Sequence, residues 1–473
     1  MKTLRKPTLV MLLAAMLLAG CVKEVEPTPE SESNDTVGHF NPYAAEDTPL
    51  SEHFLPEFEF VFRLHPNLDG TFYALADGEK GDFLLKLDNN GYVQQRVELG
   101  YQCMRSILNT GGNIILLGNL GYVDSPFNMS SSGYVAVYDQ NMQLTATLTL
   151  SEPQYKIEIY SIIQDSHNPN VFYVGGAAVD DSYQQHPYLC TLQFSEGLMT
   201  KVSSKIYTDR MRNRIIGMVE KSENGQHDLI LETIHYSLID SPYDANRSSV
   251  HIVKLNYFEE STGWGATTWD VPVIGLHGDS YTRSNSIDSD ENNVYFFGLY
   301  CDDKEPAPAS NGYWDSGCVA AINWHQGQLT WSKTISLTNK DEHLYYGFLS
   351  GGYLYACGGH SGLYYLKTQK SFSNGLVVKI SLSGELVTYK TFGDPERSSY
   401  LHHMVKDTNG NLVCVGESNE NLGDGKKKYS GWFLKTDMSN ATHKTFMDAP
   451  LNQQEEMLDV ILSAGCDESI SIH

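Results

Sequence analysis

Apolar residues recur along this chain in short runs, and turns rich in Gly, Asn and Asp separate them. The clearest unit covers residues 400–446 and contains four such runs, at residues 401–405, 412–416, 431–436 and 442–446. Short runs bounded by these turn residues are typical of β-strands joined by hairpins. No segment after residue 60 keeps a 3.6-residue apolar period over a convincing length, so the pattern predicts an all-β fold with very little helix.

The second and third strands of this unit recur in step along the chain. The second strand recurs seven times, at residues 72–76, 114–118, 171–175, 229–233, 294–298, 353–358 and 412–416. The third strand recurs at residues 82–87, 133–138, 187–192, 250–255, 317–322, 375–380 and 431–436. From Asp82 to Gly431, six intervals cover 349 residues, about 58 each. Four-stranded repeats of slightly shorter length are typical of β-propellers.

A closed ring gives each of these small sheets a neighbour for both faces, which one sheet alone cannot provide. A sandwich does not explain why one four-strand unit recurs. We therefore predict a β-propeller of four-stranded antiparallel blades in residues 57–473, most simply with seven blades. Residues 457–462 and 469–473 resemble two further strands, and the alternative is an eighth blade that borrows strands near residues 53–58.

The N-terminus has the three parts of an export signal. Cationic residues come first, at Lys2, Arg5 and Lys6, and an eleven-residue apolar run follows at residues 9–19. This run is shorter than the roughly 20 residues that cross a membrane, and the order of the parts is that of a signal peptide. Leu18, Ala19, Gly20 and Cys21 resemble the lipobox of bacterial lipoproteins. The resemblance implies removal of residues 1–20 and lipidation of Cys21, which would anchor the chain to a membrane.

Residues 21–56 are dominated by Glu, Ser, Thr, Asn and Pro and read as a disordered tether behind the lipid. Val22 is unlike the aspartate that retains many lipoproteins at the inner membrane. The charged residues 23–26 resemble the signal that sends some lipoproteins to the outer face. We expect an outer-membrane lipoprotein that faces outward, with the periplasmic face as the alternative.

The charge balance limits the partners. Residues 1–20 contain three basic and no acidic residues, so the remaining chain has 30 basic and 58 acidic residues and a net charge of −28. Such a surface repels nucleic acid, so no nucleic-acid partner is expected. No CxxC or Cys/His spacing predicts a metal site, and no motif predicts a cofactor. Cys301 and Cys318 flank one loop and form a possible disulfide.

Long connections are expected on one face of the ring. If the strands of each blade run A, B, C and D outward, the B-to-C and D-to-A connections share a face, and the A-to-B and C-to-D turns share the other. The expected B-to-C loops are long, at residues 120–132, 178–186, 235–249, 300–316, 360–374 and 417–430. Long loops on a rigid scaffold commonly carry binding residues. The candidates are Tyr183, His186, Arg212, Tyr236, Tyr243, Tyr300, Trp314, His360, Tyr364 and His402.

Three functions fit these observations. The first is a surface binding protein for a glycan or a protein, since aromatic side chains of this kind stack on sugars or anchor protein partners. The second is a propeller-type polysaccharide hydrolase or lyase, although no GxSxG or HExxH motif is present. The third is a scaffold in outer-membrane assembly, because residues 320–331 resemble one docking motif of the quinoprotein-like propellers. We favour binding over catalysis.

Overall fold

The computed structural model describes most of the repeat region. It describes residues 47–100, 104–110, 112–120, 132–208, 213–223, 226–236, 248–255, 267–273, 287–306, 313–335, 342–361, 373–394, 397–423 and 426–439. All of them belong to one compact unit, Pro42–His473. The expected signal peptide, Cys21, most of the expected tether and the extra strands after residue 440 lie outside the described residues. None of the described residues forms a helix long and apolar enough to span a membrane.

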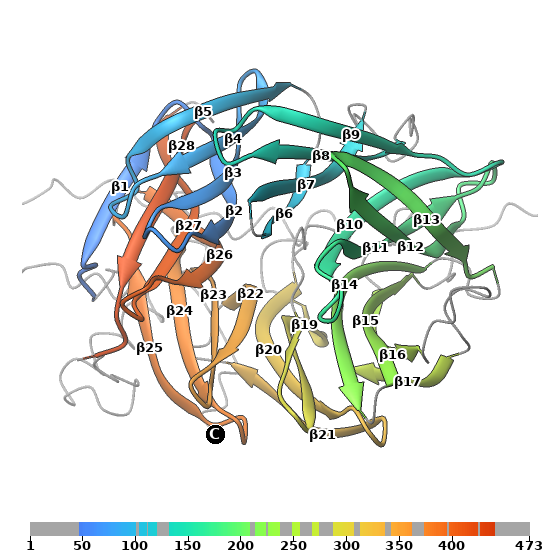
Figure 1. The fold of residues 1–473 in the computed structure, drawn as a ribbon. Helices are drawn as coiled ribbons and strands as arrows, with labels where there is room; N and C mark the ends of the chain where they lie inside the picture. The colour runs from blue at the N-terminus through green and yellow to red at the C-terminus, as the bar shows by residue number, and fades with distance from the viewer. Residues whose placement is uncertain are drawn as a thin grey trace, which may run out of the picture. The chain divides into compact units, whose positions relative to one another are not determined.

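Seven four-stranded antiparallel sheets form the blades (Figure 1). Blade 1 contains β2 (Phe60–Pro66), β3 (Phe72–Gly78), β4 (Gly81–Leu87) and β5 (Val93–Gly100). Blade 2 contains β6 (Met104–Thr110), β7 (Asn113–Leu120), β8 (Ser132–Asp139) and β9 (Leu144–Leu150). Blade 3 contains β10 (Lys156–Gln164), β11 (Val171–Val179), β12 (Gln185–Ser195) and β13 (Leu198–Ile206).

The second half of the chain repeats this arrangement. Blade 4 contains β14 (Asn213–Glu223), β15 (Gln226–Tyr236), β16 (Ser248–Leu255) and β17 (Thr267–Val273). Blade 5 contains β18 (Ile287–Ser289), β19 (Asn293–Pro306), β20 (Tyr313–Asn323) and β21 (Gln328–Ile335). Blade 6 contains β22 (Glu342–Ser350), β23 (Tyr353–Ser361), β24 (Ser373–Ser381) and β25 (Leu386–Phe392). Blade 7 contains β26 (Arg397–Lys406), β27 (Leu412–Gly423), β28 (Lys426–Thr436) and β1 (Ser51–Leu55).

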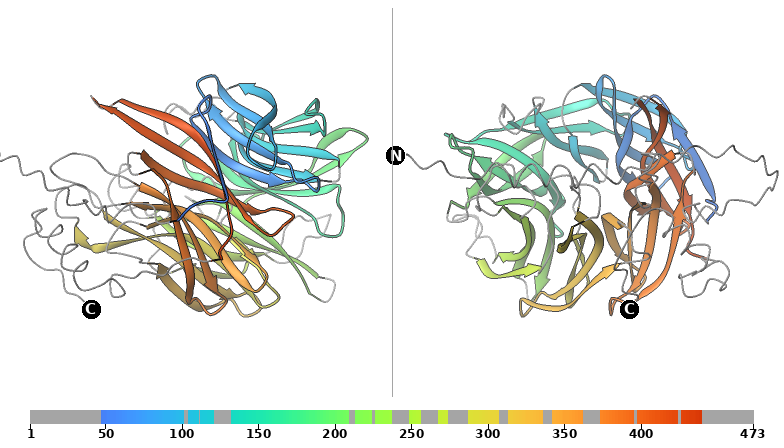
Figure 2. Two further views of the ribbon diagram at one scale, coloured as in Figure 1. Left: turned by 90° about the vertical axis from the view of Figure 1, so that its left-hand side faces the viewer. Right: turned by 180° about the vertical axis from the view of Figure 1, so that it is seen from behind.

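The first strands of the blades form a closed inner ring, because each of β2, β6, β10, β14, β18, β22 and β26 contacts the next and β26 contacts β2. The outermost strands, such as β5, β9, β13 and β21, lie at the rim (Figure 1). Figure 2 shows the same strands from the side and from behind. The prediction of a seven-bladed propeller is therefore confirmed, every expected second and third strand is present, and the described residues contain no helix.

The N-terminal strand β1 closes the ring as the outermost strand of blade 7. It pairs antiparallel with β28, with Phe54 opposite Trp432 and Ser51 opposite Lys435, and Trp432 Nε1 donates a hydrogen bond to Glu52 Oε1 at 2.8 Å. This corrects two sequence-based boundaries. Residues 51–55 belong to the propeller and not to the tether, and the fourth strand of the last unit is β1 in place of residues 442–446. The physical reason is that the open edge of β28 offers hydrogen-bonding groups that β1 satisfies.

The hydrophobic core lies between neighbouring blades. One cluster combines Val61, Phe72 and Leu85 of blade 1 with Val415 and Phe433 of blade 7, and another combines residues of blades 2 and 3. Each sheet is therefore covered on both faces, as the ring argument requires. The seam between the last and the first blade is packed like the other junctions.

The A-to-B and C-to-D connections are mostly tight turns, as expected. Asp88 Oδ1 accepts hydrogen bonds from the backbone N–H groups of Asn90 and Tyr92, and Asp407 Oδ1 does the same for Asn409 and Asn411. These bonds close Asx turns, which confirms the turn interpretation of the Asp/Asn/Gly clusters.

Two of the expected long loops are wrong. In blade 3, β11 continues to Val179 and β12 begins at Gln185, so residues 178–186 form a hairpin. In blade 7, the pairing of β27 with β28 continues as far as Gly423 opposite Lys426. The polar composition of these segments suggested loops, but paired strands that face solvent can have the same polar composition.

Candidate functional site

A β-bulge interrupts the innermost strand of six blades. The pairing with the second strand skips one residue in each case, namely Phe62, Arg105, Tyr160, Ile216, Tyr345 and His402. In the three-residue β18 the pairing is continuous. A bulge bends the strand and redirects a side chain. Four of these six residues, Arg105, Tyr160, Tyr345 and His402, are half-buried. Phe62 and Ile216 instead belong to the hydrophobic clusters between blades.

Glycines on the second strands make room for these bulges. A Cβ added at Gly176 would lie 1.9 Å from the carbonyl oxygen of Glu158. At Gly358 and Gly416 the corresponding distances, to the carbonyl oxygens of His343 and Tyr400, are 1.6 and 1.8 Å. No side chain fits at such a distance, so the glycine at this position within the second strand is a steric requirement of the bulge.

Side chains from neighbouring inner strands contact one another around the axis. The ring of Tyr345 lies 5.4 Å from that of His402, and His402 lies 6.0 Å from Phe60. On blades 2 to 4, the guanidinium groups of Arg105 and Arg214 lie 5.9 and 5.2 Å from the ring centroid of Tyr160. We call this set the axial belt, which consists of Phe60, Arg63, Arg105, Tyr160, Arg214, Tyr345 and His402.

Arg63 links the inner strands of blades 1 and 2. Arg63, which is buried, donates a hydrogen bond from Nε to the carbonyl oxygen of Arg105 at 3.0 Å. Tyr160 donates its hydroxyl hydrogen bond to Glu158 Oε2 at 2.5 Å. Burial raises the pKa of Tyr160 and the Glu158 carboxylate adds to the rise, whereas Arg214 and Arg105 oppose it. The phenol therefore stays protonated and acts as a hydrogen-bond donor.

The two adjacent histidines of blade 7 have different environments. His402 is half-buried in the belt, and its Nε2 lies 3.8 Å from Glu417 Oε2. His403 is buried and stacks on Tyr346 at 3.8 Å. Burial, together with the charges of Arg63 and His65, lowers the pKa of His403 well below its ordinary value. His403 is therefore a neutral core residue, and His402 is the one available at the axis.

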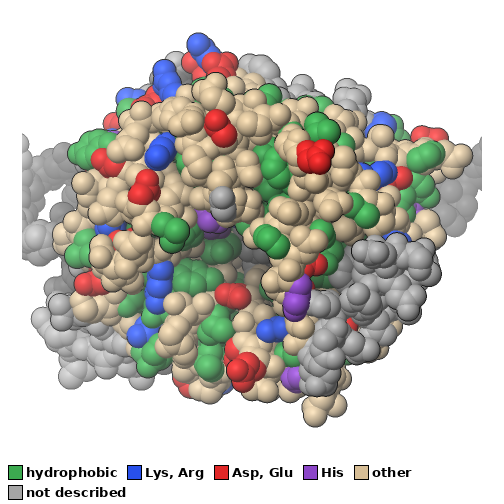
Figure 3. All heavy atoms as spheres, in the orientation of Figure 1, with side chains coloured by type: hydrophobic (Ala, Val, Ile, Leu, Met, Phe, Trp, Pro, Cys, Tyr) green, Lys and Arg blue, Asp and Glu red, His purple; other side chains and the backbone are tan. Residues whose placement is uncertain are grey.

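Figure 3 shows the molecule hollowed near its middle, with hydrophobic side chains inside the hollow and a histidine at its edge. A ring of seven sheets leaves such a space where the inner strands face one another. The belt can therefore present arginine, tyrosine and histidine side chains to a ligand from several blades.

Of the residues expected from the sequence to bind a ligand, four have described side chains, and of these four only His402 belongs to the belt. Among the described side chains, His186 is buried against Asp180 at 3.2 Å, His360 is buried against Glu342 at 3.4 Å, and Tyr183 is 55 % exposed at a hairpin turn. The backbones of Tyr236, Tyr300 and Trp314 lie in strands, but their side chains are outside the description, as are Arg212, Tyr243 and Tyr364 entirely.

The proposed disulfide between Cys301 and Cys318 is wrong. Cys318 is a buried free thiol, and its Sγ lies 3.7 Å from Ser332 Oγ. The antiparallel register places Cys301 opposite Asp315 and Cys318 opposite Gly298. The two cysteines are thus three positions apart along the ladder, because the strands extend further into the loop than their apolar cores predict.

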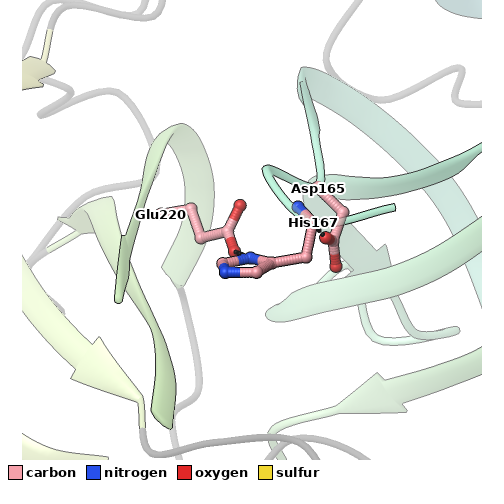
Figure 4. A group of neighbouring side chains, drawn as sticks. All are labelled: Asp165, His167 and Glu220. Atoms are coloured by element: carbon pink, nitrogen blue, oxygen red, sulfur yellow. Dashed lines mark hydrogen bonds and ion pairs between the residues drawn. The ribbon is translucent and has the colours of Figure 1, made fainter. Parts of the chain in front are cut away.

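A second cluster lies on the face of the tight turns, where Asp165, His167 and Glu220 bring three possible metal-ligand atoms within 4.8 Å of one another (Figure 4). Sequence reasoning missed it because Glu220 comes from the next blade. Glu220 accepts hydrogen bonds from the backbone N–H and the hydroxyl of Ser166 at 2.7 and 3.1 Å. Asp165 caps its own turn and accepts the hydroxyl of Tyr173. Glu220 of blade 4 is thus bonded to the A-to-B turn of blade 3, and Asp165 holds that turn within blade 3.

Comparison with known proteins identifies no family for this chain. No protein-family model matches the chain, and no curated protein matches it. It is similar to the β-propeller domain of the Trilobed protease from Pyrococcus furiosus, at 9 % identity over 79 % of this chain and 97 % of that one, with a TM-score of 0.39. Drosophila Semaphorin 2a is similar at 7 % identity, over 84 % of this chain and 77 % of that one, with a TM-score of 0.43.

Proposed function

We propose that this chain is an exported lipoprotein, anchored through Cys21 at the outer membrane and facing outward, whose propeller binds a glycan at the axial belt. The observation that carries the binding proposal is the contact of Tyr345 with His402 and of His402 with Phe60 across three blades. Aromatic rings that converge in a hollow offer apolar faces and hydrogen-bonding edges, as small-ligand sites do.

A glycan fits this arrangement better than a protein. Protein interfaces of standard size bury about 800 Å² on each partner and need a broad accessible surface. The belt is instead recessed among the inner strands, where a narrow chain of sugar rings can enter. The proposed address agrees with this function, because an outward-facing protein meets polysaccharides.

A glycan array tests the proposal. The purified protein should bind a defined subset of glycans, and Tyr345→Ala and His402→Ala should each reduce that binding. Tyr353→Ala is the matched control, because Tyr353 is 37 % exposed and begins β23 beside a turn on the opposite face. Absence of binding to any glycan, or equal loss in the control, would contradict the proposal.

A further inference from the structure

The axial belt concentrates positive charge in a very acidic protein. The chain has 33 basic and 58 acidic residues, yet Arg105 and Arg214 from two inner strands both contact the ring of Tyr160, and Arg63 from a third inner strand bonds to the backbone of Arg105. The carboxylate of Glu158 accepts the hydroxyl hydrogen bond of Tyr160. Three arginines are thus gathered at the inner strands of an acidic chain.

Arg105 has no anionic partner within the described part of the chain. Its Nε is buried and makes no hydrogen bond there, and its guanidinium contacts the face of Tyr160. The buried lysines behave differently, since Lys435 pairs with Asp407 at 2.8 Å and Lys254 pairs with Asp228 at 2.8 Å. A partly buried cation without a counter-charge is costly, and a protein rich in carboxylates could have supplied one.

We infer that the belt binds an acidic sugar, whose carboxylate or sulfate supplies the counter-charge to Arg105. Guanidinium groups bind both oxyanions through paired N–H donors. Arg105 and Arg214 contact the ring of Tyr160 from the blades on either side of it, at 5.9 and 5.2 Å from the ring centroid, so two guanidinium groups lie beside this one ring. This inference rests on the proposed function and names its ligand class.

The rest of the belt matches the other parts of such a ligand. Tyr345, His402 and Phe60 provide ring surfaces for the apolar face of a sugar. Tyr160 is held as a donor whose hydroxyl is oriented by Glu158. The belt therefore has a cationic part and an aromatic part, and strand β2 contributes to both through Arg63 and Phe60.

Calorimetric titration of the purified protein tests the inference. The probes are tetragalacturonate, its fully methyl-esterified form, which has the same backbone without charge, and a sulfated oligosaccharide of similar length. We expect an acidic probe to bind at least tenfold more tightly than the methyl ester. Arg105→Gln should remove that preference, and Arg105→Lys should restore part of it because the charge returns without the paired donors. Arg96→Gln, an exposed arginine on β5, should change nothing, and thermal unfolding checks that each variant is folded.

The outcomes separate this inference from the proposed function. If the charged and the esterified probes bind equally, or if Arg105→Gln keeps the preference for the charged probe, the inference of an acidic ligand is wrong, while the proposal of glycan binding stands. Failure of every probe, together with a silent glycan array, overturns both. A preference for the sulfated probe over the uronate supports the inference and identifies sulfate as the oxyanion.

Discussion

Replacing Leu55 by alanine tests whether the N-terminal strand holds the ring closed. Leu55 is 2 % exposed and belongs to the cluster that joins blades 7 and 1. The Cβ atom of Leu55 and a γ-methyl group of Val61 both lie close to Gly431. Truncation removes the buried isopropyl end of the side chain and leaves a cavity between two blades, so we expect the free energy of unfolding to fall by about 2–5 kcal/mol.

Urea unfolding followed by tryptophan fluorescence measures this loss, since Trp432 is buried directly opposite β1. Glu57→Ala, at an exposed position beyond the same strand, should stay within about 0.5 kcal/mol of the original protein. Hydrogen exchange should accelerate in β2 and β28 and stay unchanged in β11 and β12. Equal stability of the two variants, or uniform acceleration over all blades, would refute the idea that β1 closes the ring.

Four further predictions follow from the described contacts. Gly416→Ala should lower the free energy of unfolding by about 1–3 kcal/mol, because its Cβ would collide with the carbonyl of Tyr400; an unchanged urea midpoint would mean that the bulge is dispensable. Burial lowers the pKa of His403 and His65 in the folded protein below the ordinary value of 6.5. The unfolded chain therefore binds protons first, and stability should decline as the pH falls below about 6.5, by up to about 1.4 kcal/mol per pH unit for each histidine; His403→Gln should make that decline shallower in unfolding curves at several pH values. Calcium or zinc should leave the melting temperature unchanged if the cluster around His167 only links blades 3 and 4. A rise in the melting temperature that His167→Ala abolishes would instead establish a metal site. Cys21→Ser should move the protein from the membrane fraction to the soluble fraction, and persistent membrane association would contradict the lipid anchor.

The blades could be predicted from the sequence because their signal is local and repeated. Second strands such as residues 412–416 and third strands such as residues 431–436 are buried on both faces, so each is a continuous apolar run between turn residues. Seven copies in step leave little freedom in the architecture. The conclusion about blade number depended on this repetition and not on any single strand.

The closing strand β1 and the axial belt could not be predicted from a local, repeated pattern. β1 has five residues, and its partner β28 lies about 380 positions away, so no local pattern connects Glu52 with Trp432. A bulge is a property of the register between two strands, which the sequence of one strand does not reveal. The signal that was present was the glycine within several second strands, as at Gly358 and Gly416. The candidate residues were therefore sought on the loops and not at the axis.

The position of β1 has a mechanical consequence. Asp47 bonds to the backbone of Thr391 just before β1 begins, so the proposed tether joins the folded unit at the one blade whose outer strand has no covalent hairpin to its neighbour. Proteolysis upstream of residue 47 would shed an intact ring from the membrane. Cleavage a few residues later, or a strong force on the anchor, would separate β1 from β28 and let blades 1 and 7 move apart.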